Sequence, residues 1–271
     1  MAAQPTGLGA GVRLFRRRRH LKRYRQIISV LTRNGFGLLL EQLGVYGYLR
    51  MRRRAAEERA REAENARLSF GERLRRSCEA LGPTFVKIGQ LLSTRPDILS
   101  AEVAGELAKL QDAVNPFSFE QVSQVVAAEL GGKPETVFAA FDPKPLASAS
   151  LSQVHLAKLD DDQAVAVKVQ RPGIEEQIAI DLEILADLAR FVMHHTHYGE
   201  LYDFTGMVAE LEQSLRRELD FSEEGRNADR FRQNFLKARQ VAVPEICWSL
   251  TTPRVLTMHY IEGYRVTDHA A

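Results

Sequence analysis

The segment Val165-Ala166-Val167-Lys168 most constrains how this 271-residue chain folds, because it places a lysine in a run of apolar, mostly β-branched residues. Such a run predicts a strand. Strand alternation puts Ala166 and Lys168 on the same face. An unpaired ammonium group is costly to bury, so Lys168 needs an anionic partner, either a carboxylate or a phosphate. The alternative is a solvent-exposed lysine on an edge strand.

This strand belongs to a predicted β-hairpin, in which Ser152–Leu159 pairs with Ala164–Gln170 across the turn Asp160-Asp161-Asp162. Apolar spacing predicts helices on both sides, and Thr84 is expected to cap the helix that follows Gly82-Pro83. The order of elements predicts an α+β fold, a small antiparallel sheet with helices. The predicted helices cover 68–94, 100–112, 119–130, 174–196 and 203–236, and a second β region covers 241–262.

Composition excludes several classes of protein. The net charge is only +2, which argues against a nucleic-acid-coating protein, and 45% hydrophobic residues suffice for a core. Cys78 and Cys247 form no CxxC pair, so neither a disulfide framework nor a cysteine metal site is expected. No apolar run is long enough to span a membrane and no clear signal peptide is present. These features predict a reducing, cytoplasmic location.

The positive charge is concentrated in a predicted amphipathic helix within residues 13–40, where eight arginines and lysines lie between Arg13 and Arg25. A basic amphipathic helix can lie on an anionic membrane surface, which would place the protein at the inner face of the membrane. The alternative is a solvated helix that docks on its own domain. Nucleic-acid binding is disfavoured because interleaved aromatic residues are scarce.

A loop of small residues precedes the hairpin where a phosphate-binding loop would lie. Small side chains allow a backbone to approach phosphate closely, although alanine and serine do not adopt positive φ as freely as glycine. The alternative is an ordinary tight turn. The loop residues are Ala147, Ser148, Ala149 and Ser150, and they form no GxGxxG motif.

Two further motifs combine charged and structural residues. In Lys87-Ile88-Gly89-Gln90, helical spacing puts Lys87 and Gln90 on one face, and the glycine, costly within a helix, allows close packing. In Glu218-Leu219-Asp220-Phe221, Glu218 is a candidate partner for Lys168. The alternatives are a glycine at a helix crossing and a solvated acidic face, respectively.

These four pieces occur in the order found in one family. Lys87–Gln90 resembles its KxGQ motif, and Ala147–Ser150 followed by Gln153-Val154-His155 resembles its Ala-rich loop. Val165–Lys168 resembles its strand lysine, and Glu218–Phe221 resembles its ExD motif. Over about residues 68–265 the chain therefore resembles the UbiB/ABC1/AarF/ADCK family of atypical protein-kinase-like proteins. Ser148 departs from the run of alanines usual in that loop.

The resemblance implies a protein-kinase-like N-lobe, a small antiparallel sheet with helices, preceded by a helical extension that carries KxGQ. The expected domains are a basic N-terminal segment and linker over 1–66, the extension over 67–140, and the N-lobe up to the hinge over 141–271.

The resemblance also implies roles for individual residues. Lys168 would contact phosphates and pair with Glu218, while the Ala147–Ser150 loop would surround the phosphates. Backbone groups at the expected hinge would receive adenine, with Met258 and Tyr260 as the candidate residues. In the extension and the ExD motif, Lys87 and Gln90 would line the pocket and Asp220 would organise the extension.

The implied cofactor is ATP or ADP with Mg²⁺, and the implied activity is that of an ATPase or kinase supporting isoprenoid-quinone (ubiquinone-type) biosynthesis, with quinone-pathway proteins as partners. The catalytic loop and metal ligands belong to a C-lobe expected beyond Ala271, so the chain is expected to be a fragment without metal ligands of its own and inactive alone. The alternative is a non-catalytic membrane- or partner-binding module. His194 and His197 share a helix face, but solvated histidines are favoured over a metal site.

Overall fold

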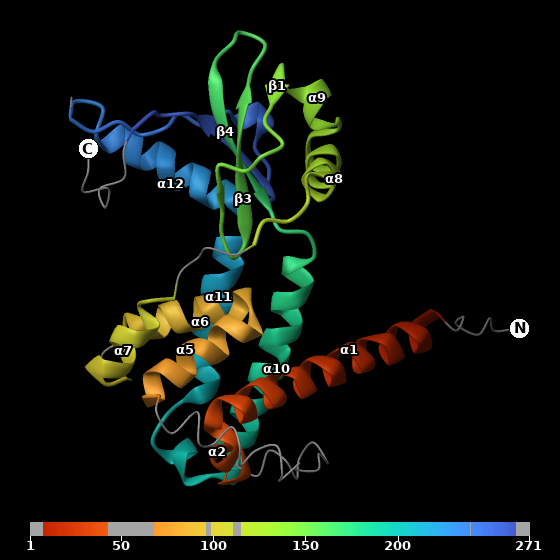
Figure 1. The fold of residues 1–271 in the computed structure, drawn as a ribbon, viewed down its shortest axis with the longest axis vertical. Helices are drawn as coiled ribbons and strands as arrows, with labels where there is room; N and C mark the ends of the chain where they lie inside the picture. The colour runs from red at the N-terminus through yellow and green to blue at the C-terminus, as the bar shows by residue number, and fades with distance from the viewer. Residues whose placement is uncertain (1–7, 43–67, 96–98, 111–114, 239, 264–271) are drawn as a thin grey trace, which may run out of the picture. The chain divides into compact units, whose positions relative to one another are not determined.

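A computed structural model describes residues 8–42, 68–95, 99–110, 115–238 and 240–263 (Figure 1). The chain divides into two compact units, each formed from two separate stretches of sequence. The first unit contains residues 1–111 and 176–212, and the second contains residues 112–175 and 213–271. Residues 43–66 of the predicted N-terminal segment and linker lie outside the described residues.

The first unit is helical in the part of the chain that the structure describes, and no helix there or in the second unit combines the length and hydropathy needed to cross a bilayer. Its elements are α1 (Leu8–Leu31), the kinked segment η1 (Thr32–Phe36), α2 (Gly37–Gln42), α5 (Phe70–Leu81), α6 (Pro83–Ser93), α7 (Ala101–Leu107), most of α10 (Ile174–His195), the 3₁₀ turn η2 (His197–Glu200) and the first part of α11 (Phe204–Leu219).

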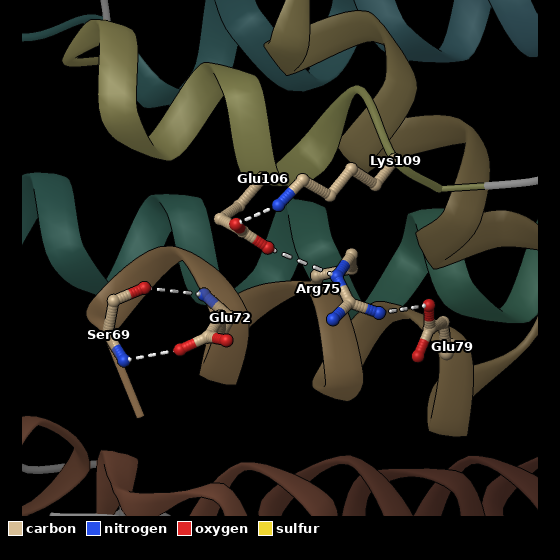
Figure 2. Close-up of polar contacts among 6 residues, drawn as sticks. All are labelled: Ser69, Glu72, Arg75, Glu79, Glu106 and Lys109. Atoms are coloured by element: carbon tan, nitrogen blue, oxygen red, sulfur yellow. Dashed lines mark hydrogen bonds and ion pairs between the residues drawn. The ribbon is translucent and has the colours of Figure 1, made fainter. Parts of the chain in front are cut away.

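Helix α5 begins with a capping box and is tied to α7 by charged side chains (Figure 2). Ser69 Oγ accepts a hydrogen bond from the backbone N–H of Glu72, whose carboxylate accepts one from the backbone N–H of Ser69. Further along the helix, Arg75 pairs with Glu79 of α5 at 2.8 Å and with Glu106 of α7 at 3.4 Å. These contacts fix where α5 starts and how it lies against α7.

Helix α6 starts by a different device from the predicted threonine cap. Gly82 occupies the N-cap position at φ 92°, a conformation that favours glycine, and Pro83 provides the first helical residue. Thr84 lies inside the first turn, and its buried Oγ1 has no hydrogen-bond partner among the described residues. The prediction that Thr84 caps this helix is therefore wrong, because the helix starts at the proline.

Helix α1 packs its apolar face inside the first unit. Tyr24, Ile27 and Ile28 are buried, and Arg23 forms hydrogen bonds of 2.6 and 2.9 Å with the fully buried carboxylate of Asp181 on α10. This arrangement agrees with the alternative in which the basic helix docks on its own domain. Because these apolar side chains are already covered, membrane association through residues 13–40 stays a prediction that rests on the basic side chains.

The second unit is built around a small antiparallel sheet in the order β1-β3-β4-β5, with β2 also paired to β3. Its elements are α8 (Phe119–Leu130), α9 (Pro134–Val137), β1 (Ala140–Phe141), β2 (Ala147–Ser148), β3 (Ser152–Lys158), β4 (Ala164–Gln170), the last part of α11, α12 (Phe221–Asn234), the 3₁₀ turn η3 (Trp248–Leu250) and β5 (Val255–His259). The predicted α+β class and the predicted hairpin are confirmed.

Helices pack on both faces of this sheet (Figure 1). On one face Val165, Val167 and Val169 of β4 form the core with α8, which starts at a Ser118 capping box. On the other face Leu256 of β5 packs with Phe221 of α12. Lys168 lies in a strand flanked by β3 and β5, so the alternative of an edge-strand lysine does not apply.

Two of the predicted elements are less regular in the structure than the sequence indicated. The helix predicted over 203–236 is broken at Asp220 into α11 and α12, and the β region predicted over 241–262 contains β5, one isolated bridge between Ile246 and Met258, and the turn η3. The break at Asp220 is held by the sheet. The carbonyl of Leu219 accepts a hydrogen bond from Gln170 at 2.7 Å, and Phe221 N–H donates to the carbonyl of Pro253 at 2.9 Å.

Candidate nucleotide-binding site

Lys168 is paired with a glutamate on the neighbouring helix. Its Nζ donates a hydrogen bond of 2.6 Å to Oε2 of Glu224 on α12 and lies 4.8 Å from the centre of the Phe221 ring. The expected pairing with Glu218 is therefore wrong, since the glutamate in contact with Lys168 lies six residues further along the chain. A lysine on a strand paired with a glutamate on a helix is the arrangement that positions the phosphate-binding lysine of protein kinases.

Asp220 explains why Glu224, rather than Glu218, reaches the strand. Asp220 is the N-cap of α12, and its carboxylate accepts a hydrogen bond of 2.9 Å from the backbone N–H of Ser222. The chain therefore leaves the helical path after Leu219, which ends α11, and Glu218 stays on α11. The first turn of the new helix brings Phe221 and Glu224 to β4 and β5.

The Lys168–Glu224 pair is partly solvated, because the side chains are 23% and 49% exposed. A pair of this kind stabilises a fold by about 0–1 kcal/mol. Its main consequence is to fix where the lysine ammonium lies.

The sheet register places Lys168 in line with the Ala-rich loop. Ala147, Val154, Lys168 and Leu256 lie directly opposite one another across β2, β3, β4 and β5. Residues directly opposite in antiparallel strands share a face, so Ala147 and Lys168 face the same side about 10 Å apart. The Ala-rich loop and the strand lysine thus face a common surface.

A second row of this surface is apolar. Leu156, Ala166 and Met258 are opposite one another in β3, β4 and β5, two residues from the lysine row and therefore on the same face. Leu156 and Met258 are only half-buried. A flat apolar group could cover this row while an attached anion lies near Lys168.

The loop itself is a tight connection between β2 and β3. Ala149 N–H donates to the carbonyl of Ser152 at 2.8 Å, Ala147 is exposed, and Ser150 is buried. The hydroxyl of Ser148 is buried and has no hydrogen-bond partner in the part of the chain that the structure describes.

Two backbone N–H groups near the expected hinge already donate hydrogen bonds to backbone carbonyls. Tyr260 N–H donates to the carbonyl of Ala164 at 2.9 Å, and His259 N–H donates to the carbonyl of Glu245 at 2.8 Å. Tyr260 N–H is therefore not available to adenine in this conformation. Met258 remains on the same face as Lys168 through its side chain.

The KxGQ residues belong to the first unit, where two of them have packing roles. Gly89 is buried against Leu110, Cys78 and Leu107, and a Cβ at this position would overlap Leu110. Gln90 Nε2 donates to the carbonyl of Leu110 at 3.2 Å. Lys87 is half-buried and also has an interaction partner. That Lys87 and Gln90 line a nucleotide pocket stays a prediction.

The histidine cluster does not form a metal site among the described residues. His195 stacks on Phe191 with ring centres 4.5 Å apart, and its Nδ1 lies 3.0 Å from the carbonyl of Phe191. The side chain of His197 lies outside the described part.

Sequence reasoning missed Glu224 as the lysine partner, although a local signal was present. Asp220 is followed three residues later by Glu223, a spacing typical of a helix N-terminus. Recognising a new helix start there would have separated Glu218 from Glu224.

A small antiparallel sheet with a lysine–glutamate pair between a central strand and a helix defines a protein-kinase-like N-lobe. In agreement with this, residues 109–271 match the model of the ABC1 atypical kinase-like domain. The chain belongs to the ABC1 atypical kinase-like family.

The chain is similar to curated proteins from several organisms. The chain is 47% identical over 205 residues to the probable protein kinase UbiB of Cellvibrio japonicus, covering 76% of this chain and 37% of that protein. It is 43% identical over 198 residues to the uncharacterized protein sll1770 of Synechocystis sp., covering 73% and 34%. The chain thus spans little more than a third of the length of these relatives.

Solved structures are also similar to the chain. The complex of Rv3197 with erythromycin from Mycobacterium tuberculosis aligns with a TM-score of 0.50 and 28% sequence identity. The alignment covers 77% of this chain and 50% of that one.

Proposed function

We propose that this chain supplies the nucleotide-binding lobe of an atypical kinase-like protein that binds ATP or ADP with Mg²⁺. The observation that carries the proposal is the sheet face on which Lys168, held by Glu224, shares a row with Ala147 and adjoins the apolar row of Ala166 and Met258. The cation and the loop backbone on this face match the phosphates of a nucleotide. The apolar row matches its adenine ring.

The residues present fit the nucleotide better than the metal. Lys168 would contact the phosphates, the Ala147–Ser150 loop would surround them, and Met258 would contact the base. No group of three acidic, histidine or cysteine side chains that could hold a metal ion occurs within the described residues. The Mg²⁺ ligands would therefore come from the remainder of the kinase-like domain, as the family resemblance implies.

The proposed reaction of the whole protein is hydrolysis or transfer of the terminal phosphate of ATP. Bound Mg²⁺ would neutralise phosphate charge. Lys168 would hold the phosphates in place, and the Glu224 carboxylate would hold the lysine side chain in the conformation that reaches them. We favour ATP hydrolysis over protein phosphorylation because, as the family resemblance implies, the KxGQ extension would occlude a protein substrate. The same resemblance suggests a role in isoprenoid-quinone (ubiquinone-type) biosynthesis.

The test is nucleotide-dependent thermal stabilisation of the full-length protein with and without Lys168→Ala. A ligand at a hundred times its Kd stabilises the folded state by about 2.7 kcal/mol, which raises the melting temperature by several degrees. We expect Mg·ADP to stabilise the wild type and Lys168→Ala to remove this shift.

Lys158→Ala is the matched control, because Lys158 lies in the same hairpin and pairs with Asp162 at the exposed end. This variant is expected to retain the full nucleotide shift. A wild type that millimolar Mg·ADP never stabilises would overturn the proposal.

A further inference from the structure

Arg171 lies at the end of β4, three residues after Lys168, and is followed by Pro172 and Gly173. A residue before proline is disfavoured in the helical region, so α10 does not begin at Arg171. Gly173 has a φ of 72°, which turns the chain into α10. The sequence Arg-Pro-Gly therefore separates β4 from α10 and leaves Arg171 next to the Ala-rich loop.

Arg171 donates hydrogen bonds to three consecutive carbonyl groups of that loop. Its backbone N–H donates to the carbonyl of Leu151 at 2.8 Å. Its side chain donates from Nε to the carbonyl of Ser150 and from Nη2 to that of Ala149, both at 3.3 Å. One residue thus contacts three successive peptide units of the loop.

These contacts tie residues 149–151 to the end of β4, since one residue donates to the carbonyl groups of all three. Ser150 and Leu151 are buried, so the loop is held against the sheet and is not a free surface segment. An alanine–serine loop lacks the freedom of glycine, so an external brace is a physical way to set this shape.

We propose that Arg171 is a positioning residue that holds residues 149–151 in the conformation that receives nucleotide phosphates. The inference rests on the proposed function, because it explains how the loop of the proposed nucleotide site is held in its conformation. It assigns Arg171 no direct contact with the nucleotide.

The competing role for Arg171 is to anchor the chain that enters α8. Its Nη2 also donates to the carbonyl of Asn115 at 3.2 Å, and its guanidinium lies 5.0 Å from the ring centre of Phe117. That segment has another anchor, however. Gln153 accepts from Phe117 N–H at 2.9 Å and donates to its carbonyl at 3.4 Å. Loss of Arg171 should therefore change the loop more than the entry to α8.

The guanidinium is partly desolvated, and this burial lowers the pKa of Arg171 below its usual value. Arginine stays charged at neutral pH even so. Hydrogen bonds from a charged donor are stronger than those from a neutral one, and water competes less where the donor is buried. The contact with the loop is therefore a partly buried one.

The experiment compares Arg171→Ala and Arg171→Lys with the wild type in the full-length protein. We expect Arg171→Ala to raise the Kd for Mg·ADP about tenfold, which corresponds to about 1.4 kcal/mol. Arg171→Lys should give an intermediate Kd. A single ammonium group lacks the forked geometry with which the guanidinium donates to the carbonyls of both Ser150 and Ala149. Hydrogen exchange of the amides at 150–152 in nucleotide-free protein should become faster in Arg171→Ala.

Arg254→Ala is the matched control. Arg254 is also half-buried in this unit, where it contacts Gln170 at 3.3 Å and Glu129 at 3.4 Å, and it makes no contact with the loop in the described contacts. Its loss should lower the melting temperature without changing the Kd for Mg·ADP.

The outcomes separate the two proposals. Suppose that the wild type binds Mg·ADP and that folded Arg171→Ala binds it with the same Kd. This result would overturn the positioning role and leave the proposed function intact. A wild type that binds no Mg·ADP would overturn the proposed function, and the positioning role with it. If Arg171→Ala does not fold, Arg171→Lys decides, and a wild-type Kd and exchange rate in that variant would count against the inference.

Discussion

The strand motif Val165–Lys168 and the helix motif Lys87–Gln90 differ in what surrounds their polar residues. In the sheet, Lys168 is half-buried, contacts a carboxylate and shares its face with a loop and an apolar row. In the helical unit, Gln90 is bound to the carbonyl of Leu110 and Gly89 allows the helices to approach. The first motif leaves a charged pair partly exposed on a sheet face, whereas the second uses a polar group and a glycine to assemble the helices.

This difference has a physical cause. A strand alternates its side chains, so one face of β4 forms the valine core while the other carries Lys168. Helix α6 packs on both α5 and α7, so a glycine and a glutamine in one turn both serve packing, and both contact Leu110. Motif residues in the two units should therefore respond differently to substitution.

The largest effect is expected at Gly89. In Gly89→Val the new side chain would overlap Leu110 and press on Cys78 and Leu107. Leu110 has little room to move, because its side chain is buried and its carbonyl is bound to Gln90. Overpacking of this kind should reduce the free energy of unfolding by about 3 kcal/mol, measured by chemical denaturation.

Gly105→Ala in α7 is its control, because nothing lies within 4 Å of a Cβ at that position. Alanine is the better helix former, so this variant should be stabilised by about 0.5–1 kcal/mol. Equal stability of Gly89→Val and the wild type would contradict the packing role of the helix motif.

The sequence predicted most of the elements near the site for local reasons. The β-branched run and the acidic turn define the hairpin, and the serine before Phe119 with the glycine after Leu130 defines α8. The partner of Lys168 was not predicted. Asp220 and Glu223 mark a helix start locally, but which glutamate reaches β4 also depends on the hydrogen bond from Gln170 to the carbonyl of Leu219, which joins distant parts of the sequence. Likewise, the contacts of Arg171 with the loop depend on strand register, and the packing of Gly89 depends on how three helices cross.

An intermediate effect is expected at Asp220, which separates the two glutamates. Asp220→Ala removes the side chain that accepts from Ser222 N–H, and loss of an N-cap costs about 1 kcal/mol of stability. Asp220→Ser keeps a capping oxygen and should restore most of that stability. Thermal unfolding of the three proteins measures the difference.

The two substitutions at Asp220 also test whether its charge matters. Asp220 Oδ2 lies 3.6 Å from Arg226, a solvent-exposed pair whose loss should have little effect on stability. If Asp220→Ser is as unstable as Asp220→Ala, the N-cap explanation for the helix break fails. If it is stable but loses nucleotide-dependent activity, the carboxylate has a role beyond capping.

The smallest effect on stability is expected from the pair that is central to the proposed function. In a double-mutant cycle of Lys168→Met and Glu224→Gln, the coupling energy should be below about 1 kcal/mol, because both side chains are partly solvated. Each single variant should nevertheless weaken Mg·ADP binding. A coupling energy above about 2 kcal/mol would mean that the pair is as desolvated as a core contact, and the strand motif would then resemble the helix motif in serving stability.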